Sequence, residues 1–367
     1  MTSLFIPSDR IGLYSFQKSI SQTGKAINEM IKNGRKVGWH TRELEFCSTD
    51  LWPEGHKYQC GYSVESSKEV IAVLDAFNII YEKTDSLPKP DYYLNPGEIA
   101  LYDGRGAGRE FSDPLAEVLE KGGFQFSYLG DKEIRDGRLM DYDIFLVPGS
   151  PDAGECYYNG LGELGFDQIR KFIAEKGHYM GICGGAYLPL TSYSERNHCW
   201  LNIVEATETE DLDFWHTGSG FVRCRISEPD HPVFTGVAAG ATSSLNLVYW
   251  EGPCITIRGN NVKSLATFEQ LLATGSDQSK PYWKMFDNDM ASEAVHEYYN
   301  PLTQECFDRL VESTTAFAEA HYHGNKILMY SPHPEMGNIG YGPRMDSLNF
   351  QLIFNGLFYL AAAPNIH

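Results

Sequence analysis

The sequence predicts an α/β protein, with a doubly wound, mostly parallel sheet over residues 97–367 and a small, mainly helical segment over residues 1–90. After residue 97, short apolar runs alternate with helical patterns, as in parallel sheets that carry helices on both faces. A proline-punctuated stretch, SLPKPD at 86–91, separates the two parts. The net charge is −1 over residues 1–95 and −18 over the remainder, which also indicates two segments of different character.

Composition limits the classes of function. The chain has 367 residues, 42% hydrophobic and 22% charged, as is usual for a soluble globular protein. Its net charge of −19 argues against a general nucleic-acid or anionic-membrane partner, because phosphate binding needs clustered Lys and Arg. There is no N-terminal secretory pattern, and the most apolar stretch, 350–363, is too short for a membrane span. We therefore expect a cytoplasmic protein.

The N-terminal segment shows two helical patterns. Residues 66–69 read SSKE, a capping box that opens a helix with Val70 and Leu74 on one face. An earlier helix is expected over 16–31. The pattern assigns no function to this segment.

The second segment predicts strands and helices in alternation. The first four expected strands lie at 99–102, 126–128, 144–147 and 179–182. A helix is expected to begin at Asp113, with proline at its first position, and another covers 166–173. Later strands are expected near 221–226, 245–249, 255–257, 265–268 and 327–330. An insertion near 269–324 is expected to carry a helix with an apolar face formed by Phe307, Leu310, Val311 and Phe317.

Residues 181–185 read GICGG, directly after an apolar strand and before an expected helix. This is the pattern of a nucleophile elbow, in which small neighbours let a residue on a strained turn approach its substrate. The following helix would favour the Cys183 thiolate, and the Gly184 amide would help to bind an oxyanion. The alternative is a buried structural cysteine in a glycine-rich turn, which we expect for most of the eight cysteines.

Residues 331–335 read SPHPE, at the end of another expected strand. A cysteine nucleophile needs a base that takes and returns its proton, and the base needs a third group to orient its ring. His333 and Glu335 supply both groups. A His-Pro dipeptide alone is more often a loop feature, so the indication comes from its occurrence together with the elbow.

In this combination the chain resembles the class I glutamine amidotransferase superfamily, and within it the biotin-protein-ligase N-terminal domain family. The matching stretches are LYDG at 101–104, VPGSPD at 147–152, GICGGAY at 181–187, YWEGP at 249–253 and SPHPE at 331–335. They cover nearly the whole second segment in the expected order. The resemblance implies a flavodoxin-like, class I glutamine amidotransferase-like fold.

The resemblance also implies roles for individual residues. Cys183 would be the nucleophile, His333 the base and Glu335 its orienting group. Gly149 would supply a second oxyanion amide beside that of Gly184. A substrate-binding role follows for Ser150, Asp152 and Tyr157. Ser150 stands where a glycine is common and Gly184 where an alanine is usual, but both keep the backbone approachable.

The sequence predicts neither a cofactor nor a metal. Residues 104–109, GRGAGR, resemble a nucleotide-binding loop, but Arg109 stands where a dinucleotide loop needs its third glycine. We interpret the stretch as a flexible turn above the sheet, with nucleotide binding as the alternative. His321 and His323 would share a face on a strand, but no carboxylate or cysteine partner is evident, so a surface loop is favoured over a metal site.

Two functions follow from these observations. The first is a cysteine amide hydrolase or amidotransferase acting on glutamine or a related amide, with a synthetase or other protein partner if the ammonia is passed on. The second is a catalytically silent module that binds a small molecule or another protein. Deamidation of a partner protein would use the same three residues, and the sequence does not separate it from the first function.

Overall fold

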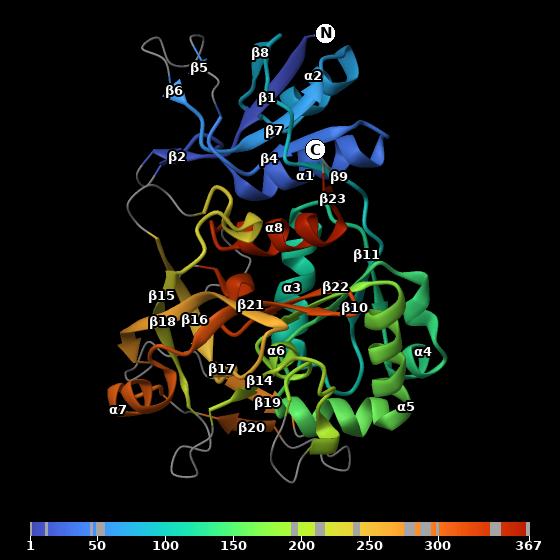
Figure 1. The fold of residues 1–367 in the computed structure, drawn as a ribbon, viewed down its shortest axis with the longest axis vertical. Helices are drawn as coiled ribbons and strands as arrows, with labels where there is room; N and C mark the ends of the chain where they lie inside the picture. The colour runs from blue at the N-terminus through green and yellow to red at the C-terminus, as the bar shows by residue number, and fades with distance from the viewer. Residues whose placement is uncertain are drawn as a thin grey trace.

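The structure of the chain is a computed structural model that describes residues 2–11, 14–44, 47–48, 56–191, 197–209, 217–237, 243–274, 283–286, 295–298, 301–337 and 346–364. Two sheets dominate it: a small N-terminal sheet at the top of Figure 1 and a larger central sheet below. Every helix in the described ranges is too short or too polar to span a bilayer.

The central sheet is parallel in one half and antiparallel in the other. The parallel strands lie in the order β11-β10-β12-β13-β22, namely β11 (Phe126–Leu129), β10 (Ile99–Tyr102), β12 (Ile144–Val147), β13 (His178–Ile182) and β22 (Asn325–Tyr330). The sheet continues antiparallel through β21 (Thr315–Tyr322), β18 (Val262–Thr274), β15 (Ser219–Ile226) and β16 (Ser244–Trp250). The short strands β14 (Ala206–Glu208) and β17 (Ile255–Ile257) pair beside it. The predicted α/β fold with parallel central strands is confirmed.

Helices cover both faces of the parallel strands (Figure 1). Ile99 and Leu101 of β10 lie in one hydrophobic core with α3 (Arg109–Lys121) and α8 (Phe350–Ala361). The alternate residues Ala100 and Tyr102 lie in a second core with α5 (Ala153–Glu175). Successive side chains of a strand point to opposite faces, so β10 is buried on both sides.

The N-terminal segment is a sheet covered by two helices, so the expectation of a mainly helical segment was wrong. Its elements follow as β1 (Ser3–Pro7), α1 (Ile20–Lys32), β4 (Val37–His40), β7 (Gly61–Glu65), α2 (Lys68–Ala76) and β8 (Glu82–Thr84). The strands lie in the order β8-β1-β7-β4 and pair antiparallel, which is a split βαβ arrangement. Its strands have five residues or fewer and pair with distant partners, which local periodicity does not reveal.

A strand from the far end of the sequence completes this sheet. β9 (Tyr92–Leu94) pairs with β4, and β23 (Ala363–Pro364) pairs with β9 at the edge. The pairing places residues from beyond α8 in the same sheet as β1, as the neighbouring labels at the top of Figure 1 show.

The two units share a hydrophobic core. The Trp39 ring of β4 lies 6.4 Å from that of Phe358 in α8, and both belong to the core that contains α3. Asp346 caps α1, accepting hydrogen bonds from Ile20 N at 2.8 Å and Ser21 Oγ at 2.6 Å.

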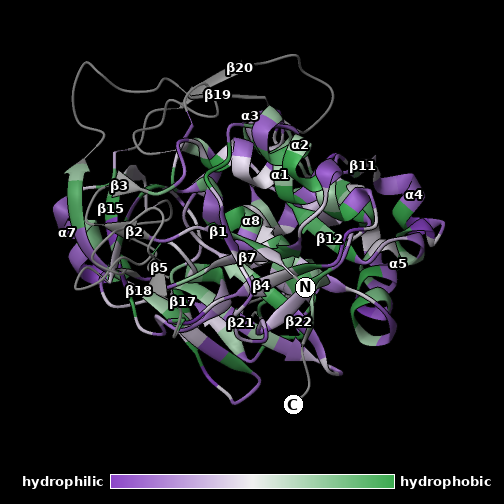
Figure 2. Ribbon diagram, turned by 90° about the horizontal axis from the view of Figure 1, so that it is seen from above, coloured by the Kyte–Doolittle hydropathy of each residue, from purple (hydrophilic) through white to green (hydrophobic). Residues whose placement is uncertain are grey.

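Figure 2 views the molecule from above, with the polar residues of the peripheral helix α4 (Asp131–Arg135) in purple.

Two expected helices differ from the structure. α3 begins at Arg109, four residues before Asp113, and Pro114 lies inside it, one turn from the start. The helix expected through Phe317 ends earlier: α7 (Gln304–Cys306) and a π-helical turn (Phe307–Val311) stop before Ser313, whose φ is 64°, and β21 follows. Because β18 extends to Thr274 and β21 begins at Thr315, both ends of the expected 269–324 insertion belong to the sheet.

The remaining described elements are short. The paired strands are β2 (Arg10–Ile11) with β3 (Tyr14–Ser15), β5 (Cys47–Ser48) with β6 (His56–Lys57), and β19 (Trp283–Phe286) with β20 (Val295–Tyr298). The helical turns are α6 (Gly184–Tyr187), Arg138–Asp141, Asn197–Cys199, Pro232–Phe234 and Pro334–Met336.

Candidate active site

Cys183 occupies the turn between β13 and α6. Its φ is 52° and its ψ is −113°, a strained combination for a residue with a side chain. The flanking glycines allow this turn: a Cβ at Gly181 would lie 2.1 Å from Gly185 O, and one at Gly185 would lie 2.2 Å from Val147 O. α6 has a single turn, so the helix-dipole effect expected at the sulfur comes from a short helix.

Neighbouring parallel strands bring the candidate base to this turn. Ile182 at the end of β13 is in register with Tyr330 at the end of β22, so Cys183 and His333 follow adjacent strand ends. Trp250 contacts both residues. Its carbonyl oxygen accepts a hydrogen bond from Cys183 Sγ at 3.2 Å, and its ring lies 6.2 Å from that of His333.

His333 and Glu335 form a buried pair. Nδ1 of His333 donates to Oε1 of Glu335 at 2.6 Å, and the two side chains are 0% and 1% exposed. Burial opposes the charged ring, but electrostatic and hydrogen-bonding interactions with Cys183 and Glu335 outweigh burial and raise the pKa of His333 to about 10. Nε2 of His333 has no nitrogen or oxygen partner among the described residues, and the ring interacts with Cys183, so Nε2 is available for proton exchange with the sulfur.

Aromatic and apolar side chains close the site. The Phe111 ring, in the first turn of α3, stacks on that of His333 at 5.3 Å and 19° and lies 4.6 Å from that of Trp250. Val248 and Met336 complete this group, which we call the aromatic cover. Cys183 is only 3% exposed beneath it. A substrate therefore reaches the sulfur only if neighbouring groups move, and Trp250 of this cover is the one that contacts Cys183.

The backbone segments of the two predicted oxyanion donors lie against each other. A Cβ at Gly184 would lie 2.5 Å from Ser150 N, and one at Gly149 would lie 2.6 Å from Cγ of Phe111. In the loops and turns that the structure describes, the amides of Gly149, Ser150 and Gly184 donate no hydrogen bond to a backbone carbonyl. Unpaired amides beside a nucleophile are the groups that an oxyanion requires.

The three residues expected to bind substrate lie in different environments. Ser150 is 8% exposed, and its Oγ has no partner among the described residues. Asp152 is exposed at the N-terminus of α5. Tyr157 is fully buried in the core between the sheet and α5, and its hydroxyl donates to Pro148 O at 2.6 Å. A substrate contact for Tyr157 does not fit this position, because its polar atom is already used.

The glycine-rich stretch 104–109 is a packed loop that ends in α3. A Cβ at Gly106 would lie 2.4 Å from the Tyr157 ring, and Gly108 N donates to Gly149 O at 3.2 Å. Tyr102 accepts from Gly106 N and donates to Asp131 at 2.6 Å. The stretch thus forms the expected turn after β10, and the turn supports the segment at Gly149.

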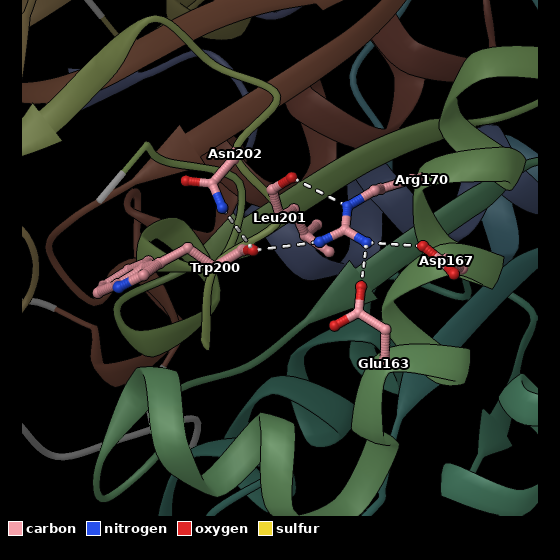
Figure 3. A network of polar contacts seen from close by, with 6 residues as sticks. All are labelled: Glu163, Asp167, Arg170, Trp200, Leu201 and Asn202. Carbon is pink, nitrogen blue, oxygen red and sulfur yellow. Dashed lines mark hydrogen bonds and ion pairs between the residues drawn. The ribbon is translucent and has the colours of Figure 1, made fainter. Parts of the chain in front are cut away.

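A second group of contacts connects α5 with Tyr187, the last residue of α6. Figure 3 shows Arg170 of α5 donating to the carbonyls of Leu201 at 3.0 Å and Trp200 at 3.4 Å while it pairs with Glu163 and Asp167. The Trp200 ring packs against that of Tyr187 at 5.5 Å.

Tyr187 in turn holds the backbone beside Cys183. Its hydroxyl lies 2.6 Å from Oε1 of Glu208 and 3.0 Å from the Glu251 carbonyl. Glu251 follows Trp250 and has a φ of 52°. The turn that presents the Trp250 carbonyl to the sulfur is thus anchored through Tyr187 to α5.

Phe111 and Trp250 are the site residues that sequence reasoning missed. Trp250 lay within one matched stretch, at 249–253, but no chemistry pointed to it. No pattern indicated Phe111, because the expected helix began after it.

The other candidates form no site. Within the described residues, no three His, Cys, Asp or Glu side chains are grouped so as to hold a metal ion. His321 lies 3.8 Å from Glu319, and His323 has a φ of 51° in the turn that follows. The seven cysteines whose side chains the structure describes, all but Cys47, are buried and form no disulfide.

Comparisons with known proteins give fold similarity at low identity. No protein-family model matches the chain, and no curated protein matches it. Among solved structures, PurLQS from Thermotoga maritima is 15% identical with a TM-score of 0.43, over 72% of this chain and 98% of that chain. A glutamine amidotransferase from the same organism is 9% identical with a TM-score of 0.43, over 73% and 99%. A beta-galactosidase from Bacillus circulans is 11% identical with a TM-score of 0.37, over 74% and 31%. Similarity this low assigns no activity.

Proposed function

We propose that the chain is a cysteine-nucleophile amide hydrolase or amidotransferase acting on glutamine or a related amide through Cys183, His333 and Glu335. The observation that carries the proposal is the buried His333–Glu335 pair beside Cys183, in which Glu335 holds Nδ1 and leaves Nε2 for proton exchange. The interactions with Cys183 and Glu335 raise the pKa of His333, which favours the protonated ring. An imidazolium beside a sulfur favours the thiolate, which is the nucleophilic form.

The reaction follows from these groups. His333 takes the proton of the Cys183 thiol, the sulfur leaves the Trp250 carbonyl and attacks the amide carbon, and the carbonyl electron pair moves onto oxygen. The amides of Gly149 and Gly184 stabilise that oxyanion. His333 then protonates the departing nitrogen as the C–N bond breaks, leaving a thioester and an amine or ammonia. Water, deprotonated by His333, attacks the thioester, and the acid and the Cys183 thiol are released.

The class I glutamine amidotransferase-like assignment belongs to the same proposal. It is supported by the strand order β11-β10-β12-β13-β22, by helices on both faces, and by a nucleophile at the carboxyl end of a central strand. The ammonia would go to a synthetase partner or to water. The biotin-protein-ligase N-terminal domain-like family remains the specific relative that we propose.

A catalytically silent binding module is the second candidate. The observation in its favour is the closed state of the site, in which Cys183 is 3% exposed and its thiol donates to the Trp250 carbonyl. Such a module would bind its ligand without forming a bond to Cys183.

The intact mass of the protein after exposure to a diazo-ketone glutamine analogue separates the two candidates. We expect one adduct on the wild type and none on Cys183→Ala. Alkylation of Cys183 by iodoacetamide without reaction with the analogue would leave a competent thiolate with another substrate. If neither reagent modified Cys183, the enzymatic proposal would be wrong.

A further inference from the structure

The backbone carbonyls of Pro148 and Gly149 accept hydrogen bonds from groups that take no part in the proposed chemistry. The Tyr157 hydroxyl donates to Pro148 O at 2.6 Å, and Gly108 N donates to Gly149 O at 3.2 Å. Tyr157 is fully buried, and among the described residues its hydroxyl has this one hydrogen bond, so the contact is specific rather than incidental.

Peptide geometry transmits this restraint to the neighbouring amides. The Pro148–Gly149 peptide is trans. A trans peptide is planar, with its C=O and N–H pointing in opposite directions. Holding Pro148 O against Tyr157 therefore directs the Gly149 N–H away from Tyr157. Holding Gly149 O against Gly108 directs the Ser150 N–H in the same way.

The Gly184 amide is set by a matching restraint within the elbow. Cys183 O accepts from Ala186 N at 2.8 Å, and this carbonyl shares a peptide plane with the Gly184 N–H. The two predicted oxyanion donors are therefore fixed differently. The Gly184 amide depends on a backbone contact within the elbow, whereas the Gly149 amide depends on the side chain of Tyr157.

The packing around Tyr157 makes the restraint rigid. A Cβ at Gly106 would lie 2.4 Å from the Tyr157 ring, so the loop before α3 lies directly on it. Asp131 accepts from Tyr102 at 2.6 Å and from Arg105 N at 3.0 Å, which holds that loop in place. The glycine-rich stretch and Tyr157 thus form one support behind Gly149.

We propose that Tyr157 is a positioning residue for acyl transfer at Cys183: its buried hydroxyl holds the Pro148 carbonyl and so aims the Gly149 amide at the oxyanion. This inference rests on the proposed function, because an oxyanion forms only if Cys183 attacks a carbonyl. It replaces the expected substrate contact of Tyr157 with an indirect role.

The test variant is Tyr157→Phe, which removes the hydroxyl and keeps the ring. Loss of one oxyanion donor lowers rates by about 100- to 1000-fold, so a misdirected amide should cost about 10- to 100-fold. The matched control is Tyr330→Phe, since Tyr330 is also buried and also donates to a backbone carbonyl, that of Leu352 at 3.2 Å.

Two reagents distinguish stabilisation of the oxyanion by the Gly149 amide from reactivity of the Cys183 thiol. p-Nitrophenyl acetate acetylates a thiol through a tetrahedral oxyanion and releases p-nitrophenolate, whereas iodoacetamide alkylates it by direct displacement without one. We expect Tyr157→Phe to slow acetylation of Cys183 about 10- to 100-fold and to leave alkylation unchanged, with both rates unchanged in Tyr330→Phe.

Each other outcome contradicts the inference in a recognisable way. Equal loss of both rates in Tyr157→Phe would show a general structural role, and no loss of either would show that the hydroxyl does not matter. In both cases the proposed function would stand. If the wild type were acetylated no faster than Cys183→Ala, the proposed function would fail, and the inference with it.

Discussion

Two pairs of histidine and glutamate with little exposure lie in the part of the chain that the structure describes, and their difference separates a chemical site from a structural one. His231 uses both ring nitrogens: Nε2 lies 3.1 Å from Glu319, and Nδ1 accepts from Val233 N at 3.3 Å. Glu319 also accepts from Tyr359 at 2.8 Å. His333 also pairs with a carboxylate, but its Nε2 has no nitrogen or oxygen partner among the described residues. Unused hydrogen-bonding capacity in a buried ring is costly and indicates a role beyond folding.

The largest effect should come from the pair at Cys183. His333→Gln removes the cation and the base, so we expect the rate of Cys183 alkylation by iodoacetamide at pH 7 to fall about 100-fold or more. Glu335→Gln, which keeps a partner for the ring but removes its charge, should lower the rate less. An unchanged rate in His333→Gln would mean that the His333–Glu335 pair has only a structural role, as the second histidine pair does.

Opening the aromatic cover should have the next largest effect. Ring contacts contribute about 0.5–1.5 kcal/mol each, and Phe111 has two, to His333 and Trp250. Phe111→Leu should therefore favour the open state and raise the alkylation rate of Cys183 by roughly tenfold, because 1.4 kcal/mol corresponds to a factor of ten. Phe221→Leu at the rim of the cover is the control. Equal rates in all three proteins would mean that reagents reach the sulfur by another route.

The effect of His333 on Cys183 should persist over a wide range of pH. With the pKa of His333 raised to about 10, the imidazolium persists across neutral pH. We therefore expect the wild type to be alkylated faster than His333→Gln at both pH 7 and pH 9, because the protonated ring acts on the sulfur throughout this range. Equal rates in the two proteins at pH 9 would contradict the raised pKa of His333.

The same pKa shift has a consequence for stability. Because the pKa of His333 is raised in the folded state, protonation of His333 contributes to the free energy of unfolding. This contribution is complete below about pH 6.5, the ordinary pKa, and is lost as pH rises through about 10. Urea unfolding of the wild type at pH 6.5 and 9.5 should show this fall, and Cys183→Ala should show a smaller one.

The smallest effect on Cys183 is expected from the second pair. His231→Leu should leave the alkylation rate unchanged, while the unfolding free energy falls by about 1–3 kcal/mol because a buried oxygen of Glu319 loses its partner. Urea unfolding measures the fall. A lower alkylation rate at full stability would connect His231 with the active site.

Local chemistry explains which features were predictable from sequence. The elbow and the His-Pro-Glu stretch are contiguous, and each follows an apolar strand, so their residue types and spacing are readable. The hydroxyl of Tyr157 could not be assigned to Pro148 because that hydrogen bond depends on tertiary packing. Phe111 was missed for a local reason: proline usually begins a helix, yet α3 starts four residues before Asp113.

The N-terminal sheet was missed for a different physical reason. Residues 37–40 are all buried, so they lack the alternation of a half-exposed strand. Their pairing with β7 and β9 joins segments that no local window contains. The helices beside them were predictable from local signals, although the capping box at 66–69 placed the second N-cap at Ser66, one residue before the observed Ser67.

The position of β23 bears on how the protein is made and how it can be divided. The strand that closes the N-terminal sheet, and the helix that covers Trp39, are synthesised only after the entire central sheet. During translation the first ninety or so residues would therefore expose the apolar face that later meets α8, a situation in which chains aggregate or engage chaperones. Expression of that part alone should give insoluble material, and its solubility should recover when it is co-expressed with the remainder of the chain.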